Sequence, residues 1–167
     1  NAADLVQSVD LVFDTIDLLD LSGITVLHDE CRRQGKPLFS AFSAGFGAAL
    51  IYFPADGKIS WREVFDLPLE GPVNNMSYVE RFGSKLAKLK DVLDPMIMRA
   101  MGQALRIMED GTPCPAPHVS PGAAAVGALA VTAAVRVLAG LPVTEAPRMI
   151  IADLYAACTS PGIDLTA

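Results

Sequence analysis

The chain has 167 residues, of which 51% are hydrophobic, so it can fill one core and its length requires no second domain. Thirteen basic residues against nineteen acidic ones give a net charge of −6. An acidic chain of this kind offers no broad positive field to nucleic acid or to an anionic membrane surface, and we expect neither as a partner.

The cysteines and the least charged segment bear on the cellular compartment. Cys31, Cys114 and Cys158 are far apart and form no CxxC pair, which predicts neither a disulfide framework nor a structural zinc site and favours a reducing cytoplasm. Segment 120–135 is uncharged but shorter than the ~20 strongly apolar residues of a membrane span, so we expect a buried helix there. The first residue is Asn1 rather than Met, and the residues after it do not have the basic and then apolar pattern of a signal peptide. We therefore interpret the chain as a fragment.

The first third of the chain alternates between helical and extended patterns. A short helix is expected at residues 1–8, a strand in "VDLVFD", and a helix over residues 19–34, where apolar residues recur at helical spacing and Gly35 follows two arginines. Two strand-like runs follow, "LFSAFS" and "AALIYF", separated by a turn that contains Gly45 and Gly47. This order predicts an α/β domain with a mainly parallel, Rossmann-like sheet.

The remainder of the chain is mostly helical. Residues 59–72, "ISWREVFDLPLEGP", are expected to be short and extended, and a helical insertion follows at about residues 74–111. Within it, Asp94 and Pro95 have the order that begins a new helix. "TPCPAPHV" predicts a loop, Ser120 with Pro121 begins an Ala- and Gly-rich helix that ends near Gly140, and "RMIIADL" predicts a last strand.

Acidic residues are concentrated where the first strand meets the next helix, in "LVFDTIDLLD". If the strand ends near Phe13, then Asp14 and Asp17 lie at its carboxyl end, where open α/β sheets bind ligands. A carboxylate there can hold a magnesium ion that bridges nucleotide phosphates, because magnesium needs only one or two protein carboxylates. The alternative is that Asp17 or Asp20 caps the helix that follows.

Three segments together resemble a known family: "NAADLVQSVDLVFDTID", "KPLFSAFSAGFGAALIYFPADG" and "CPAPHVSPGAAAVGALAVTAAVRVLAG". In this order they look like the C-terminal half of the ubiquitin-activating-enzyme-like ThiF/MoeB/HesA adenylyltransferase domain. In that family a strand that ends in Asp-x-x-Asp is followed by a helix, a Lys-Pro-led strand, a crossing strand, a variable segment, a small-residue helix and a final strand. The resemblance covers most of residues 1–154 outside the insertion.

The resemblance implies an ATP- and magnesium-dependent enzyme that attaches AMP to a carboxylate, such as the C-terminus of a ubiquitin-like protein, sulfur carrier or peptide. It implies that Asp14 and Asp17 bind the cofactor, that Asp17 is catalytic and lies at the magnesium ion, and that the complete protein is a homodimer. The N-terminal half of the domain, with the glycine-rich nucleotide turn and the acid that holds the ribose, would then be a missing partner of this chain. This chain by itself would be inactive.

The sequence also departs from the family pattern. Leu18 stands where the family usually has Asn, no Arg follows until Arg32, and the CxxC zinc site of many members is absent from this sequence. Two alternatives therefore stay open. One is a non-catalytic relative that uses the same scaffold to bind a partner protein, and the other is the trailing half of a Rossmann-type oxidoreductase.

Other residues allow a functional interpretation beside a structural one. Cys114 has His118 four positions on, which would suit a low-pKa nucleophile, and the resemblance implies a thioester or sulfur-transfer role for a cysteine near the crossover segment; the alternative is an inert loop cysteine. His28 and Cys31 share a helix face and could bind a metal, although core packing is the simpler interpretation. The methionines of residues 96–108 could form an adaptable partner surface or core, and the bases between residues 81 and 90 a solvated face or a contact with an acidic partner.

Overall fold

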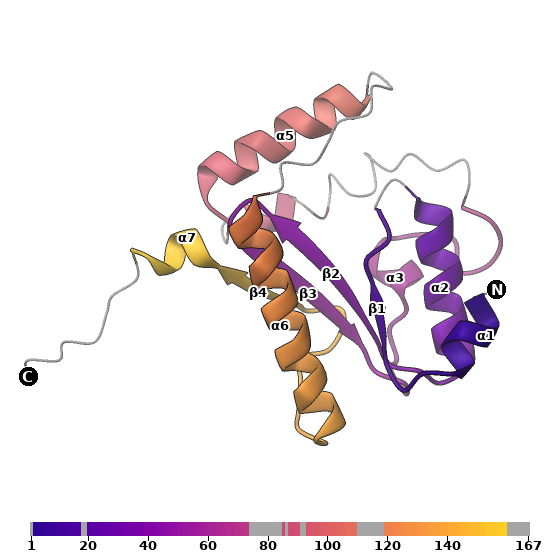
Figure 1. Ribbon diagram of the computed structural model, residues 1–167. Coiled ribbons are helices and arrows are strands. Elements are labelled where there is room, and N and C mark those ends of the chain that lie inside the picture. Colours follow the sequence, from indigo (N-terminus) through magenta and orange to yellow (C-terminus); the bar gives the residue numbers. More distant parts are fainter. Residues whose placement is uncertain are drawn as a thin grey trace, which may run out of the picture.

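A computed structural model describes residues 2–17, 20–73, 85, 87–90, 93–109 and 119–159. Its centre is a four-stranded sheet in the order β1-β2-β3-β4, with β1 at Val12–Asp14, β2 at Leu38–Ala44, β3 at Gly47–Phe53 and β4 at Met149–Asp153. Helices flank this sheet (Figure 1). The protein is therefore of the α/β class, as expected.

Only one of the three strand pairings is parallel, so the expectation of a mainly parallel sheet is wrong for the strands described. β1 and β2 are parallel because α2, at Leu21–Arg33, carries the chain back to the starting edge of the sheet. β2 and β3 are joined by a tight turn, which permits only an antiparallel pair, and Gly45 takes a φ of 57° there. β3 and β4 are also antiparallel.

The two faces of the sheet pack against different helices. Along β2 and β3 successive side chains alternate between the faces. Leu38, Ile51 and Phe53 pack in one cluster with residues of α2. Phe39, Leu50 and Tyr52 pack in the other with the alanines of α6, at Ser120–Leu138. The result is three layers with α2 on one side and α6 on the other (Figure 1).

The short elements complete the α2 side and the ends of the chain. α1, at Ala2–Gln7, contacts α2 and buries Val6. α3, at Trp61–Val64, lies in the segment that was expected to be extended. That expectation is wrong because Ser60 and Glu63 form a reciprocal capping box, which satisfies the first amides of a helical turn. The 3-10 turn η1 spans Ala87–Leu89, and α7 spans Leu154–Ala157.

The two long helices of the second half begin as predicted. α5, at Pro95–Glu109, starts directly after Asp94, whose Oδ1 accepts the backbone N–H of Met96 at 2.7 Å. α6 begins at Ser120 and ends at Leu138, but it is less buried than expected. Gly122, Ala130, Ala133 and Ala134 are buried, whereas Val131, Val135 and Leu138 on the outer side are exposed. By length and composition alone α6 could cross a membrane, and here it packs on the sheet.

Candidate functional site

The two acids at the end of β1 have different surroundings. Asp14 is the last residue of the strand and only 4% of it is exposed, whereas Asp17 lies three residues further on and is exposed. The backbone between them turns at once, since Asp14 Oδ1 accepts the N–H of Ile16 at 3.0 Å. Asp17 is therefore the acid that solvent, and any ligand at this edge, can reach.

Asp14 is held inside by two polar side chains from neighbouring elements. Its Oδ2 lies 3.1 Å from Nε2 of His28 in α2 and 3.4 Å from the hydroxyl of Ser40 in β2. His28 Nε2 also lies 2.9 Å from the Ser40 hydroxyl. Together with the N–H of Ile16, these groups supply three donors to the carboxylate, which is what a buried charge requires.

The residues Asp14, His28 and Ser40 have the composition of a hydrolase triad but not its geometry. In a working triad the acid bonds one ring nitrogen of histidine and the serine bonds the other. Here the same nitrogen, Nε2, faces both the carboxylate and the hydroxyl. Ser40 is also completely buried, so no substrate carbonyl could reach it. The cluster therefore joins β1, α2 and β2 and is not a nucleophilic centre.

His28 is kept neutral by its surroundings. Burial lowers the pKa of His28, while the hydrogen bond to Asp14 and the charges of Asp14 and Asp29 oppose that shift. Its ring packs against Phe53 and Trp61, with centroids 5.0 Å and 4.5 Å away. Sequence reasoning placed His28 in the core with Cys31, which is where both residues lie. It missed the contact with Asp14, because the two residues come from different elements.

The acid that caps α2 is Asp20. Its Oδ1 accepts the N–H of Gly23 at 2.8 Å, and its backbone N–H donates to the carbonyl of Asp17 at 2.8 Å. The capping alternative is thus confirmed for Asp20. Asp17 lies within this turn, just ahead of the positive end of the α2 dipole.

A second helix, α6, begins at the β2–β3 turn, at the end of the sheet toward which β1 and β2 both run. A Cβ atom on Gly122 would lie 1.9 Å from the carbonyl oxygen of Gly45, so α6 starts directly against the β2–β3 turn. Gly45 also touches α5, since a Cβ there would lie 2.1 Å from Cδ1 of Ile97. The small residues of "SAGFGAA" allow this close packing, and they bring α5 and α6 to the turn of the β2–β3 hairpin, which lies beyond the point where β1 ends opposite Ser40.

The remaining candidate residues contribute less to this edge. Cys114 and His118 lie outside the described residues. Burial raises the pKa of the Cys31 thiol to about 11, so that thiol is a poor nucleophile and a poor metal ligand at neutral pH. Within the described part of the chain, no three His, Cys, Asp or Glu side chains are grouped so that they could hold a metal ion.

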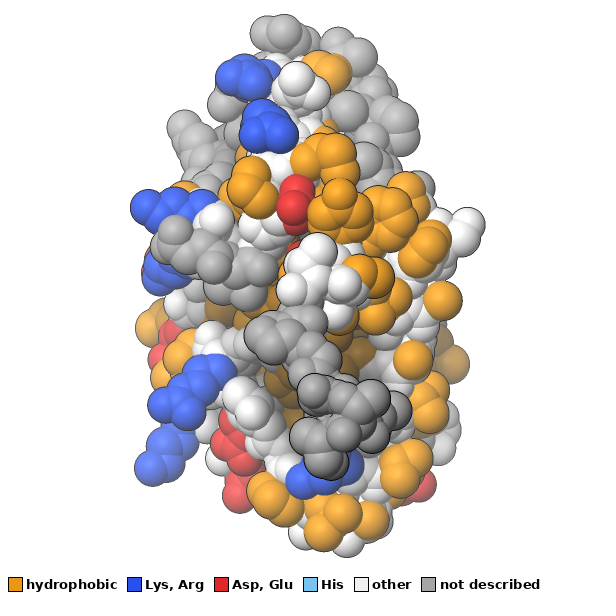
Figure 2. All heavy atoms as spheres, turned by 90° about the vertical axis from the view of Figure 1, so that its left-hand side faces the viewer, with side chains coloured by type: hydrophobic (Ala, Val, Ile, Leu, Met, Phe, Trp, Pro, Cys, Tyr) orange, Lys and Arg blue, Asp and Glu red, His pale blue; other side chains and the backbone are white. Residues whose placement is uncertain are grey.

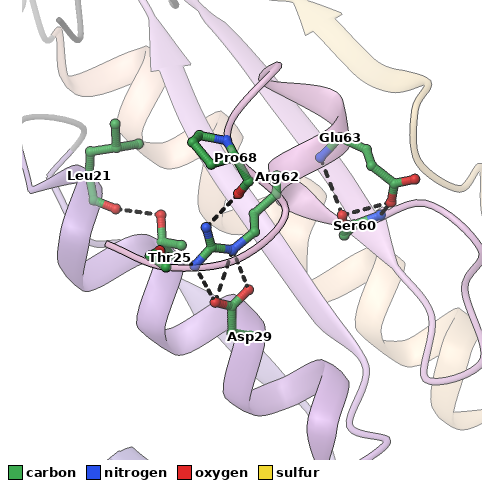
Figure 3. A network of polar contacts seen from close by, with 8 residues as sticks. Leu21, Thr25, Asp29, Ser60, Arg62, Glu63 and Pro68 are labelled. Carbon is green, nitrogen blue, oxygen red and sulfur yellow. Dashed lines mark hydrogen bonds and ion pairs between the residues drawn. The ribbon is translucent and has the colours of Figure 1, made fainter. Parts of the chain in front are cut away.

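Sequence reasoning also missed a buried arginine on the α2 side of the sheet. Arg62 is 7% exposed and bonds both carboxylate oxygens of Asp29, with its Nη2 at 2.7 Å from Oδ2. Figure 3 shows Arg62 between Asp29 and the carbonyl of Pro68, to which Nη1 donates at 2.6 Å. Nη2 also donates to the carbonyl of Gly71 at 3.0 Å. All three guanidinium nitrogens donate within the protein, so this network fastens α3 and the following loop to α2 and is better explained as structural than as a ligand site.

A cavity of about 30 Å³ lies beside this network, lined among others by His28, Phe53 and Trp61. It has room for about one water molecule. The indole N–H of Trp61 is buried with no hydrogen-bond partner among the described residues. The cavity is too small for a nucleotide, so the sheet edge at Asp17 is the better candidate site.

Comparison with known proteins adds no relative: no protein-family model matches the chain, and no curated protein matches it. The assignment of a function therefore depends on the sequence pattern and on the geometry described above.

Proposed function

We propose that this chain is the C-terminal part of an ATP-dependent adenylyltransferase domain similar to ThiF, MoeB and HesA, which activates the carboxylate of a ubiquitin-like, sulfur-carrier or peptide substrate. The observation that carries the proposal is the position of Asp17, an exposed residue just beyond the carboxyl end of a strand in a parallel β1–α2–β2 unit. Ligands of open α/β sheets bind outside such strand ends. In this proposal the complete fold is Rossmann-like and the protein is cytoplasmic.

Asp17 has the donor chemistry that magnesium prefers, an oxygen of a solvent-accessible carboxylate. In the proposed enzyme Asp17 holds the magnesium ion that accompanies ATP. Bound there, the ion would supply positive charge against the repulsion between the α-phosphate and the substrate carboxylate. Asp14 acts as a positioning residue, because its bonds to Ile16, His28 and Ser40 fix the turn that presents Asp17.

The free edge of the sheet supports the proposal that further polypeptide completes the domain. β1 is the terminal strand of the described sheet, and Phe13 in it is 39% exposed. An open strand edge with an apolar side chain is a ready pairing surface. We propose that the N-terminal half of the domain pairs there and supplies the residues that bind adenosine, and that the complete protein is a homodimer.

The test is the exchange of labelled pyrophosphate into ATP by the protein encoded by the whole reading frame, with candidate carrier proteins and peptides as carboxylate substrates. We expect exchange to need magnesium and a substrate, and Asp17→Asn to lower it by about a hundredfold or more. Asp10→Asn is the control, since Asp10 is also exposed but precedes β1. Equal exchange by the two variants would remove Asp17 from the mechanism.

A second function, a non-catalytic scaffold that binds a partner protein, is favoured by one feature. No Arg follows Asp17 until Arg32, so the described edge carries fewer phosphate-binding groups than the family pattern implies. For such a scaffold we expect no pyrophosphate exchange with any carboxylate, and no glycine-rich nucleotide turn in the coding sequence upstream of Asn1.

A further inference from the structure

The outer face of α5 combines hydrophobic and basic side chains. Met96 and Ile107 are 46% and 45% exposed, and Arg99, Gln103 and Arg106 between them are exposed as well. The spacings of three, four, seven and eleven residues place all five on one side of the helix. Solvent exposure of two large apolar side chains on one helix side is a feature that a binding surface would explain.

The opposite side of α5 holds the helix to the rest of the protein. Ile97 is buried against the β2–β3 turn, where it contacts Gly45. Met98, Met101 and Met108 are only half-buried. Methionine side chains adapt to different shapes at low energetic cost. The inner side of α5 can therefore repack against the rest of the protein when a partner binds its outer face.

The charge around α5 is opposite to that of the whole chain. Over residues 85–109, up to the end of α5, five basic residues stand against three acidic ones, although the chain carries a net charge of −6. Lys88 and Lys90, just before α5, are exposed, and α5 contains no acid before Glu109. Figure 2 shows basic and hydrophobic side chains side by side at the top of the molecule, where α5 lies.

We propose that the outer face of α5 is a docking surface for an acidic peptide segment with apolar anchors, carried by a partner protein. The guanidinium groups of Arg99 and Arg106 can each bind a carboxylate through two hydrogen bonds. Met96 and Ile107 supply the apolar contact beside them. The surface goes beyond the proposed enzymatic function, because it needs neither ATP nor magnesium.

An acidic peptide fits this face better than nucleic acid does. Binding to a phosphate backbone requires a long row of cations, whereas this face has two arginines between two apolar residues. Amphipathic peptides that pack against a helix use anchors at helical spacing with charges at the rim, which is the pattern here. An anionic membrane would also meet cations and apolar groups, so it is an outcome of the test.

The test is fluorescence anisotropy with a labelled amphipathic peptide built from Leu and Glu, measured at low and at high salt without nucleotide. We expect saturable binding that weakens with salt. The double variant Arg99→Glu with Arg106→Glu should weaken binding by about tenfold or more, because both attractive contacts become repulsive. Met96→Ala should weaken it by a smaller factor, without changing the salt dependence.

Arg148→Glu is the matched control, since Arg148 is exposed outside α5 and the reversal changes the net charge in the same direction. It should leave binding within about twofold. The proposal is overturned if the acidic peptide does not bind, if the α5 variant and the control behave alike, or if a peptide of Leu and Lys binds equally well. Tighter binding to a DNA oligonucleotide or to phosphatidylserine vesicles would also overturn it. Because no nucleotide is present, none of these results bears on Asp17.

Discussion

At the scale of single residues, the protonation of His28 makes the stability dependent on pH. In the unfolded chain His28 binds a proton below its ordinary pKa of 6.5, whereas burial lowers its pKa in the folded protein. Below pH 6.5 the unfolded state therefore binds more protons than the folded state. The free energy of unfolding then decreases as the pH is lowered, by up to about 1.4 kcal/mol per pH unit. Urea unfolding at pH 7.5 and 5.5 measures this loss.

A variant pair assigns that loss to one histidine. In His28→Gln the difference between pH 7.5 and 5.5 should shrink, even though the variant is less stable at both. In His118→Gln, which alters the other histidine of the chain, the difference should persist. Carboxylates with lowered pKa values, such as Glu30 at about 2, titrate well below this window. An unchanged difference in His28→Gln would contradict the assignment.

The two cysteines that the structure describes should differ in reactivity. Cys31 is 2% exposed and burial raises its pKa to about 11, whereas Cys158 is exposed. Since the thiolate is the reactive form, brief treatment of the folded protein with iodoacetamide at pH 8 should label Cys158 and spare Cys31. Peptide mass mapping measures the fraction of each cysteine that is labelled. In urea, where the protein is unfolded, Cys31 and Cys158 should be labelled equally. Equal labelling of both in the folded protein would show that Cys31 is accessible.

The sequence predicted residue roles unevenly. Proximity along the chain was enough for the Asp94–Pro95 start of α5 and for a cap of α2 by a nearby acid. It was not enough for the contact of Asp14 with His28, fourteen residues away on another element. The Ser60-x-x-Glu63 spacing did carry a signal for α3, which the neighbouring prolines obscured.

At the scale of elements, the bond between Arg62 and Asp29 holds α3 against α2. Asp29→Asn removes the negative charge but keeps the shape, so the buried guanidinium loses its ionic partner. We expect a loss of about 1–3 kcal/mol in the free energy of unfolding, measured with urea. Glu30→Gln alters the neighbouring pair with Arg33 and should have a smaller effect, because the Arg33 side chain is 66% exposed and stays hydrated when the charge of its partner is lost. Equal effects would mean that Arg62 does not need its partner.

The contact between α6 and the β2–β3 turn depends on a glycine. In Gly122→Ala the added Cβ would meet the carbonyl oxygen of Gly45 at 1.9 Å, which is backbone and cannot move cheaply. We expect a loss of about 1–3 kcal/mol in unfolding free energy. Gly127→Ala, where nothing lies within 4 Å, should gain up to about 1 kcal/mol from helix propensity. A Gly122→Ala variant more stable than the wild type would show that Gly122 does not pack against the carbonyl oxygen of Gly45 as described.

Most elements could be predicted from the sequence, but their pairing could not. Hydrophobic periodicity located α2, apolar runs of strand length located β2 and β3, and the Ser120–Pro121 start of an uncharged segment located α6. Strand direction depends instead on how the chain returns to the sheet. The short turn at Gly45 was visible in the sequence and should have indicated an antiparallel pair. The exposed outer side of α6 could not be foreseen, since Ala and Gly suit either side of a helix.

At the scale of the whole molecule, two features are located apart from the core. The carboxyl edge of β1 presents Asp17, and α5 presents arginines in an otherwise acidic protein. Under the proposed function, the first is where a metal-bound nucleotide would lie, because ligands of open α/β sheets bind outside the carboxyl ends of the strands. β1 is also the terminal strand of the described sheet.

The most direct test of this account is the affinity of Mn²⁺, as a substitute for magnesium, for the protein of the whole reading frame in the presence of ATP. Electron paramagnetic resonance measures the unbound ion. We predict ATP-dependent binding that Asp17→Asn weakens by about tenfold or more and that Asp10→Asn leaves unchanged. Equal Mn²⁺ affinity in the wild type and Asp17→Asn would contradict the claim that the end of β1 holds the metal of a nucleotide.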